Sequence, residues 1–224
     1  MRIVRIWAIL GLVISSLSWA DSVSKPVPVL LVRGMLTGNS ILDPVKRRLE
    51  AKGFIVDYAL YQCRVGETSL IGAAKEIEIS AKKLMEETKS DQVDVIGFSL
   101  GAIAARYFIQ RLDGKKMVRK FISIAGPHHG TYLAYVAPFL VGIREMMPGS
   151  AFINDLNADM HPWGPVEVYS LYTPYDAIVI PAHHSILPHS HHVKKFQVTF
   201  HHQMIKDKEV LDYVADVLKQ PYRP

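Results

Sequence analysis

One short stretch of the chain has the residue pattern of a reactive serine. Ser99 lies two residues after Gly97 and two residues before Gly101, in the order Gly-x-Ser-x-Gly. A β-rich apolar run at 93–98 leads into it, and a helix pattern rich in small residues follows at 100–107. A strand, a tight turn and a helix in this order are typical of a turn that exposes a serine hydroxyl for nucleophilic attack. The alternative is an ordinary tight turn between a strand and a helix.

Two features of this turn would assist such an attack. Gly97 and Gly101 suit positions where neighbouring backbone segments come too close for a Cβ atom. The helix behind the serine directs the positive end of its dipole toward the negative charge that attack creates. We therefore expect the backbone N–H of Leu100 to be one donor to that oxyanion.

A serine nucleophile needs a base whose pKa lies near neutrality and a carboxylate that orients the base. Asp176 follows an apolar run at 168–172, and two adjacent histidines, His201 and His202, follow another run at 193–200. Parallel strands place the residues at their carboxyl ends along one edge of the sheet. The chain thus supplies a serine, an acid and a histidine in that order. The alternatives are a solvated turn for Asp176 and structural roles for the histidines.

A sheet must position these residues, and strand and helix patterns alternate along the chain as such a sheet requires. The expected strands are 26–32, 54–61, 93–98, 120–125, 166–172 and 193–200. The expected helices are 45–52, 69–89, the helix after Ser99, and a closing helix marked by Val210, Val214 and Val217. This order predicts an α/β fold, with a doubly wound, mostly parallel sheet of about six strands, helices on both faces and minimal or no cap.

Residues 1–20 are predicted to be an export signal. Two arginines precede the apolar run 6–17, and small residues follow it at positions 18 and 20. The run is too short for a good membrane span, although an uncleaved anchor is the alternative. We expect residues 21–224 to form a single domain of an exported protein, either periplasmic or secreted.

Length, charge and cysteine content exclude several classes of protein. The chain has 224 residues, of which 49% are apolar, enough for one domain with a full core and too few for two. Its net charge of +5 falls by two without residues 1–20, which is too mild for nucleic-acid binding and only weakly favours an anionic membrane surface. The single cysteine, Cys63, cannot form an intrachain disulfide, so packing must supply the stability.

Two segments have roles that the sequence leaves open. The apolar residues of 132–147 fit either an acyl-chain surface near Ser99 or a helix that faces the core. Five histidines fall within 183–192, which suits a polar exposed loop. Imidazole also binds zinc, but no acid or cysteine accompanies these histidines, so we expect no metal site there.

The chain carries further motifs between residues 29 and 210. They are Arg-Gly-Met at 33–35, Ala-Gly-Pro-His-His-Gly-Thr at 125–131, Met-Pro-Gly-Ser-Ala-Phe at 147–152, Tyr-Thr-Pro-Tyr-Asp-Ala-Ile-Val at 172–179, and the final histidine segment. Together with the serine turn they resemble the small bacterial triacylglycerol lipases and esterases of the α/β-hydrolase superfamily, the compact kind without a large lid. The Gly-Pro-His-His-Gly-Thr stretch is fairly specific to lipase-like members, whereas the serine turn is specific only to the superfamily.

The resemblance implies the α/β-hydrolase fold, a reaction without a cofactor, and roles for individual residues. It implies that Ser99 is the nucleophile and Asp176 the acid. It favours His201 over His202 as the base, because the Met-Ile pair and the valine that follow keep the family's spacing from His201.

The resemblance also assigns the second oxyanion donor, and here the chain departs from the family. The donor is the backbone N–H of the residue after the glycine of the first loop, which is Met35. Relatives usually have His-Gly where this chain has Arg33 and Gly34. A backbone donor survives a change of side chain, so the oxyanion hole can persist. Arg33 would order the loop by hydrogen bonds, pair with a substrate carboxylate or phosphate, or form a salt bridge with a neighbouring acid.

We therefore expect a serine hydrolase that cleaves carboxylic esters, above all acyl lipid esters, through an acyl-enzyme. A carboxylesterase for short soluble esters and a thioesterase are close alternatives. A catalytically silent hydrolase fold that serves as a binding module is the alternative from another class, and Arg33 is its best support. The expected partners are a lipid or small ester substrate and, transiently, a membrane or lipid surface. The sequence leaves the oligomeric state open.

Overall fold

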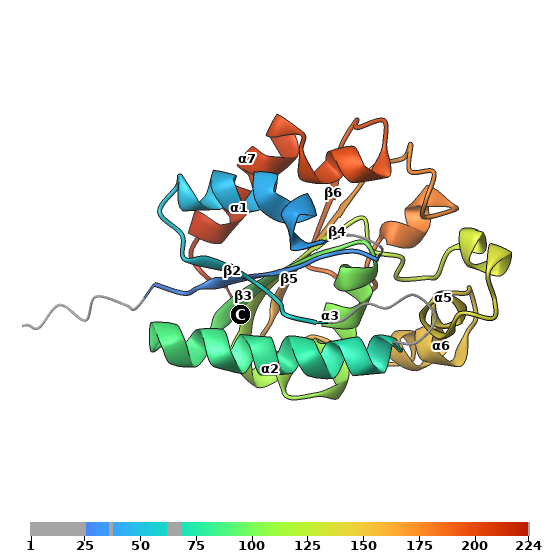
Figure 1. Ribbon diagram of the computed structural model, residues 1–224, viewed down its shortest axis with the longest axis horizontal. Helices are drawn as coiled ribbons and strands as arrows, with labels where there is room; N and C mark the ends of the chain where they lie inside the picture. The colour runs from blue at the N-terminus through green and yellow to red at the C-terminus, as the bar shows by residue number, and fades with distance from the viewer. Residues whose placement is uncertain (1–25, 36–37, 62–68, 224) are drawn as a thin grey trace, which may run out of the picture.

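The computed structural model describes residues 26–35, 38–61 and 69–223. The expected export signal and Cys63 lie outside these residues. One six-stranded sheet has the order β2-β1-β3-β4-β5-β6, and all neighbouring strands in it are parallel (Figure 1). The strands are β1 (Val29–Val32), β2 (Val56–Tyr58), β3 (Val93–Phe98), β4 (Val118–Ile124), β5 (Glu167–Tyr172) and β6 (His192–Lys195). The predicted doubly wound α/β sheet is confirmed.

Helices cover both faces of this sheet, as Figure 1 shows. On one face lie α2 (Leu70–Thr88) and α3 (Leu100–Arg111), and on the other lie α1 (Asp43–Glu50) and α7 (Lys208–Lys219). The shorter helices are α4 (Gly114–Met117), α5 (Val141–Glu145) and α6 (Ala151–Asn157). Among the described residues, no helix combines the length and apolar character that a membrane span requires.

Strand β1 illustrates why the strands in the middle of the sheet are continuous apolar runs. All four of its residues are buried. Leu30 and Val32 belong to the apolar cluster that contains α2 and α3, whereas Val29 and Leu31 belong to the cluster that contains α1 and α7. Because successive side chains of a strand point to opposite faces, a sheet covered on both faces needs apolar residues at every position.

The two edge strands are shorter than the sequence predicts. The structure has β2 at Val56–Tyr58 and β6 at His192–Lys195, against expected strands at 54–61 and 193–200. Each edge strand pairs on one side only, so its ladder ends where that neighbour ends. After β6 the chain leaves the sheet and forms a short 3-10 helix, η4 (His201–Ile205), before α7 begins.

The segment 132–147 is not one core-facing helix. It contains a 3-10 helix, η2 (Tyr132–Val136), followed by α5. Pro138 lies between them, and a proline both lacks an N–H donor and disfavours helical geometry at the residue before it. That residue, Ala137, accordingly has a φ of −136° and a ψ of 60°.

Candidate active site

Ser99 lies at the turn between β3 and α3, where the backbone is strained. Its φ of 54° and ψ of −126° fall outside the regions that residues with a side chain favour. A Cβ on Gly97 would lie 2.5 Å from the Cα of Ala102, and a Cβ on Gly101 would lie 2.5 Å from the carbonyl oxygen of Val32. Backbone approaches this close explain why both positions are glycine.

The structure brings Asp176 and His201 together beyond the ends of β5 and β6. Asp176 Oδ2 lies 2.7 Å from His201 Nδ1. The other carboxylate oxygen, Oδ1, accepts hydrogen bonds from the N–H groups of Ile178 at 2.8 Å and Val179 at 3.0 Å. The exposed fraction of the side chain is 0% for Asp176 and 3% for His201. The carboxylate is therefore held at both oxygens, and it fixes the orientation of the imidazole.

The ring of His201 lies against the serine turn. It packs on Phe98, the residue directly before Ser99, with the ring centroids 4.9 Å apart. Because Nδ1 faces the carboxylate, we assign the ring proton to Nδ1, which leaves Nε2 as an acceptor. Nε2 is buried and has no hydrogen-bond partner among the residues that the structure describes. This nitrogen is therefore available to take a proton from a serine hydroxyl.

His202 has different surroundings. Its side chain is exposed, and its ring centroid lies 5.4 Å from that of His201. Partial burial and the neighbouring His201 lower the pKa of His202. In the part of the chain that the structure describes, Asp176 bonds to the ring of His201 and makes no such bond to His202. Of the two histidines, His201 is thus the one with a carboxylate to orient it.

An apolar cavity of about 240 Å³ lies beside Ser99. Segment 132–147 forms one wall of it, through Leu133, Ala134, Val136, Ala137, Ile143 and Met146. The loop after Asp176 contributes Ile178 and Val179. A lining of this kind removes apolar ligand surface from water, so the cavity suits an acyl chain. Of the two roles considered for 132–147, these contacts favour a surface near the serine.

The two backbone N–H groups expected to hold an oxyanion belong to Leu100 and Met35, which both line the cavity beside Ser99. Leu100 is the first residue of α3, so its N–H has no partner within the helix. The first loop also approaches the serine, since a Cβ on Gly34 would lie 3.2 Å from the Cβ of Ser99. Met35 follows that glycine and lines the same cavity as Ser99.

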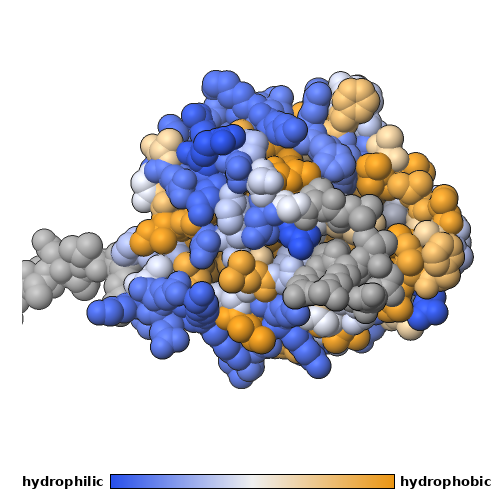
Figure 2. All heavy atoms as spheres, in the orientation of Figure 1, coloured by the Kyte–Doolittle hydropathy of each residue, from blue (hydrophilic) through white to orange (hydrophobic). Residues whose placement is uncertain are grey.

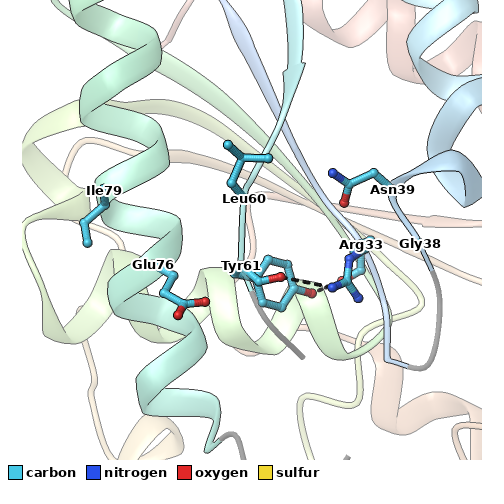
Figure 3. A pocket seen from close by; sticks show the side chains of 7 residues that line it. All are labelled: Arg33, Gly38, Asn39, Leu60, Tyr61, Glu76 and Ile79. Carbon is cyan, nitrogen blue, oxygen red and sulfur yellow. Dashed lines mark hydrogen bonds between the residues drawn. The ribbon is translucent and has the colours of Figure 1, made fainter. Parts of the chain in front are cut away.

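Arg33 braces the loop that carries Met35. Its guanidinium donates to the carbonyl oxygens of Gly34 at 3.2 Å and Tyr61 at 3.0 Å, and it lies over the Tyr61 ring (Figure 3). The Tyr61 hydroxyl in turn donates to the carbonyl oxygen of Arg33. Of the roles expected for Arg33, the ordering of its loop is the one that these contacts support.

A buried histidine and a buried arginine lie behind the serine turn, and sequence patterns predict a role for neither. His128 Nε2 lies 2.6 Å from Ser123 Oγ. Arg106 donates to the carbonyl oxygens of His128 at 3.2 Å and Leu156 at 2.8 Å. Burial lowers the pKa of His128 well below its usual value and lowers that of Arg106 to about 9. Both side chains brace the loop that follows β4.

Hydrogen bonds and ring contacts order part of the histidine-rich stretch. His184 Nδ1 lies 2.9 Å from the carbonyl oxygen of Gly130, and His191 Nδ1 accepts a backbone hydrogen bond at 3.0 Å. The ring of His192 stacks on Tyr169, with the centroids 4.4 Å apart. Over the described ranges, no group of three or more histidine, cysteine, aspartate or glutamate residues is arranged to hold a metal ion.

Comparisons of the sequence give one family. The family model described as palmitoyl protein thioesterase matches residues 28–161. Palmitoyl-protein thioesterase 3 of Dictyostelium discoideum is 27% identical to the chain over 115 residues, which are 49% of this chain and 39% of that protein. The match thus spans well under half the length of that relative.

Solved structures resemble the chain over most of its length. Lipase B of Aspergillus fumigatus has a TM-score of 0.74 at 18% identity and covers 88% of this chain and 53% of its own. The propeptide form of lipase BlEst2 from Bacillus licheniformis has a TM-score of 0.75 at 14% identity, and the match covers 89% of this chain and 52% of that one. The lin2722 product of Listeria innocua has a TM-score of 0.67 at 14% identity, and the match covers 88% of this chain and 96% of that one. Identities this low establish the fold alone, and the predicted α/β-hydrolase fold is confirmed.

Proposed function

The chain belongs to the palmitoyl protein thioesterase family, and we propose that it is a serine hydrolase of acyl esters or thioesters. One observation carries the proposal: a strained serine turn opens onto an apolar cavity, and a buried histidine–aspartate pair lies against that turn. In this proposal Ser99 is the nucleophile, His201 the base, and Asp176 the residue that orients the base.

The reaction begins when Ser99 attacks the acyl carbonyl carbon. His201 Nε2 takes the hydroxyl proton as the bond from Oγ to carbon forms. The N–H groups of Leu100 and Met35 hold the negative oxygen that results. The intermediate collapses when the alcohol or thiol departs with the proton from His201, and an acyl-enzyme remains. Water then gives a proton to His201 and attacks the acyl carbon, which releases the carboxylic acid and restores Ser99.

The cavity and the family match support a substrate with an acyl group. The proposed site could cleave that group from either an ester or a thioester. The relative in Dictyostelium discoideum carries the name of a thioesterase, and two of the similar folds are lipases. A serine nucleophile cleaves either bond by the same steps. We propose acyl lipid esters as the principal substrates and thioesters as the close alternative.

Apolar side chains around the cavity support transient contact with a lipid surface. Figure 2 shows such side chains gathered at the right-hand edge of the molecule, where α5 and α6 lie in Figure 1. Val136 and Phe139, both 77% exposed, belong to the cavity-wall segment, and no aspartate or glutamate occurs in 127–144. Contact with lipid would remove these side chains from water.

Phe139→Ser should weaken adsorption to phosphatidylglycerol vesicles, and Ile79→Ser on α2 should not.

The proposed setting of the enzyme is outside the cytoplasm. The support is the basic, apolar and small-residue pattern of residues 1–20. Mass spectrometry of the protein expressed from its full sequence in a bacterium would test this. Cleavage of an export signal predicts an N-terminus near Asp21, whereas a retained Met1 would contradict cleavage and leave the uncleaved anchor.

Hydrolysis assays test the proposed activity and separate its two substrate classes. The wild-type chain and Ser99→Ala are compared on p-nitrophenyl decanoate and on decanoyl-coenzyme A. Loss of a triad serine typically lowers turnover about a million-fold, so Ser99→Ala should be inactive on both while its circular dichroism is unchanged. The two wild-type rates, each divided by the rate of the uncatalysed hydrolysis of the same substrate, decide between ester and thioester. A folded wild-type chain that cleaves neither would contradict the proposal and favour a binding module.

A further inference from the structure

The side-chain hydroxyl of Thr131 makes three hydrogen bonds. It donates to the carbonyl oxygen of Ile178 at 2.8 Å, and it accepts from the N–H groups of Ile180 at 2.9 Å and Leu133 at 3.3 Å. A hydroxyl has one donor and two acceptor sites, so these bonds fill its capacity. Thr131 is only 5% exposed, which leaves little access for water to replace any of them.

Backbone hydrogen bonds reinforce the same junction. The N–H of Thr131 donates to the carbonyl oxygen of Met146 at 2.8 Å, and the N–H of Tyr132 donates to that of Ile180 at 2.8 Å. Thr131 therefore joins three parts of the site: the loop after β4, the cavity wall at 132–147, and the loop that follows Asp176.

The loop that Thr131 holds is the loop that holds the acid. Ile178 takes part in both contacts, since its carbonyl accepts from Thr131 and its N–H donates to Asp176 Oδ1 at 2.8 Å. The other oxygen of Asp176 lies 2.7 Å from His201 Nδ1. An unbroken series of hydrogen bonds thus runs from the Thr131 hydroxyl to the imidazole.

We propose that Thr131 is a positioning residue whose hydroxyl fixes loop 178–180 and, through that loop, the orientation of Asp176 and His201. The inference rests on the proposed function, in which this pair activates Ser99. Loss of the hydroxyl would leave the Ile178 carbonyl and the Ile180 N–H without their partner, so the loop would shift to find others. The carboxylate would move with it.

Thr131 also lines the cavity, so its two possible effects must be separated. A change in the acyl-binding surface would affect a decanoyl chain far more than an acetyl group, because the acetyl group buries much less apolar surface. A displaced acid–base pair would slow both substrates alike. The length of the acyl chain therefore distinguishes positioning from binding.

The test compares Thr131→Val, which removes the hydroxyl, with Thr131→Ser, which keeps it. We expect kcat of the valine variant to fall at least about tenfold on both p-nitrophenyl acetate and p-nitrophenyl decanoate, because small displacements of reacting groups are costly. KM for the acetate should change little. The serine variant should restore most of kcat. The matched control is Thr88→Val, which removes a hydroxyl that donates to the carbonyl oxygen of Leu84 within α2 and that is not among the groups lining the cavity.

Two results would overturn the inference. One is an unchanged kcat on both esters in a folded valine variant, and the other is a loss confined to the decanoate. If the valine variant does not fold, Thr131→Cys takes its place, since a thiol is a weaker hydrogen-bonding group and must give the same equal loss. An inactive wild-type chain would contradict the proposed function, whereas an active wild type with an unaffected variant contradicts only the role of Thr131.

Discussion

In the proposed chemistry, Asp176 orients the base through a hydrogen bond to its ring. Its side chain is fully buried, and burial alone would disfavour a charged carboxylate. Two backbone N–H donors and the ring of His201 supply the hydrogen bonds that offset this cost. When His201 takes a proton, the resulting positive charge lies next to the carboxylate in a site with little water, where their attraction is stronger than in bulk solvent.

The same geometry predicts a difference between the two adjacent histidines. His201→Ala removes the group that would take the Ser99 proton, so its kcat should fall about as far as that of Ser99→Ala, roughly a million-fold. His202→Ala should be much milder, because the described structure gives His202 no bond to Asp176. Steady-state hydrolysis of p-nitrophenyl butyrate by the purified variants is the measurement. A larger loss in His202→Ala would assign the base to His202.

The sequence indicates some of the site residues directly and leaves others hidden. Ser99 lies in a recognisable motif. Asp176 follows the carboxyl end of a predicted strand, where parallel sheets place their functional residues. Arg106 has no such signal, because a buried arginine in a helix has the same local sequence pattern as one on the surface. The hydroxyl of Thr131 bonds to a loop almost fifty residues further along the chain, and a local sequence pattern cannot indicate a partner that distant.

The serine turn has no room for an added Cβ at Gly101. Gly101→Ala would place a Cβ against the carbonyl oxygens of Val32 and Arg33, which are backbone atoms that cannot rotate away. We expect a loss of about 3 kcal/mol in the free energy of unfolding, at the upper end of the usual cost of overpacking. Urea denaturation followed by circular dichroism measures it.

Gly38→Ala is the matched control for that substitution. Gly38 has a φ of −76°, and among the described residues the nearest atom to an added Cβ is Ser40 Oγ at 3.6 Å, an ordinary contact. Its unfolding midpoint should stay close to that of the wild type. Equal stability of the two alanine variants would show that the backbone around Ser99 is looser than these distances indicate.

The cavity wall at 132–147 is attached to the rest of the fold at both ends. At its start, the N–H of Tyr132 donates to the carbonyl oxygen of Ile180 at 2.8 Å, and near its end Glu145 Oε2 accepts from the N–H of Leu70 at the start of α2 at 2.5 Å. Strand and helix patterns do not predict such a segment, because its apolar residues suit a helix until Pro138 interrupts it. Its shape comes from these distant partners rather than from its own periodicity.

An attached wall predicts how the rate depends on the physical form of the substrate. The rate of tributyrin hydrolysis should rise smoothly with concentration across the solubility limit, because a wall attached at both ends would not exchange between closed and open forms at an oil–water interface. Titration of the released butyric acid measures this. A sharp increase at saturation would mean that the segment moves as a lid.

At the scale of the whole molecule, the strand order explains how distant parts of the chain meet. β3, β4 and β5 are adjacent and parallel, so the residues after them share one edge of the sheet. Ser99 follows β3, the loop with Thr131 follows β4, and Asp176 follows β5. The alternation of strands and helices predicts the fold class and the parallel pairing. It does not predict the ends of the edge strands or the path of η4, which depend on packing.

A fluorophosphonate probe tests the central claim, that Ser99 is an activated nucleophile, most directly. Such a probe phosphonylates a serine hydroxyl that an adjacent base activates and leaves ordinary serines unmodified. Intact-mass and peptide mass spectrometry should find one adduct on the wild-type chain, located at Ser99, and none on Ser99→Ala or His201→Ala. A folded wild-type chain that gains no adduct, or an adduct at another serine, would contradict the account.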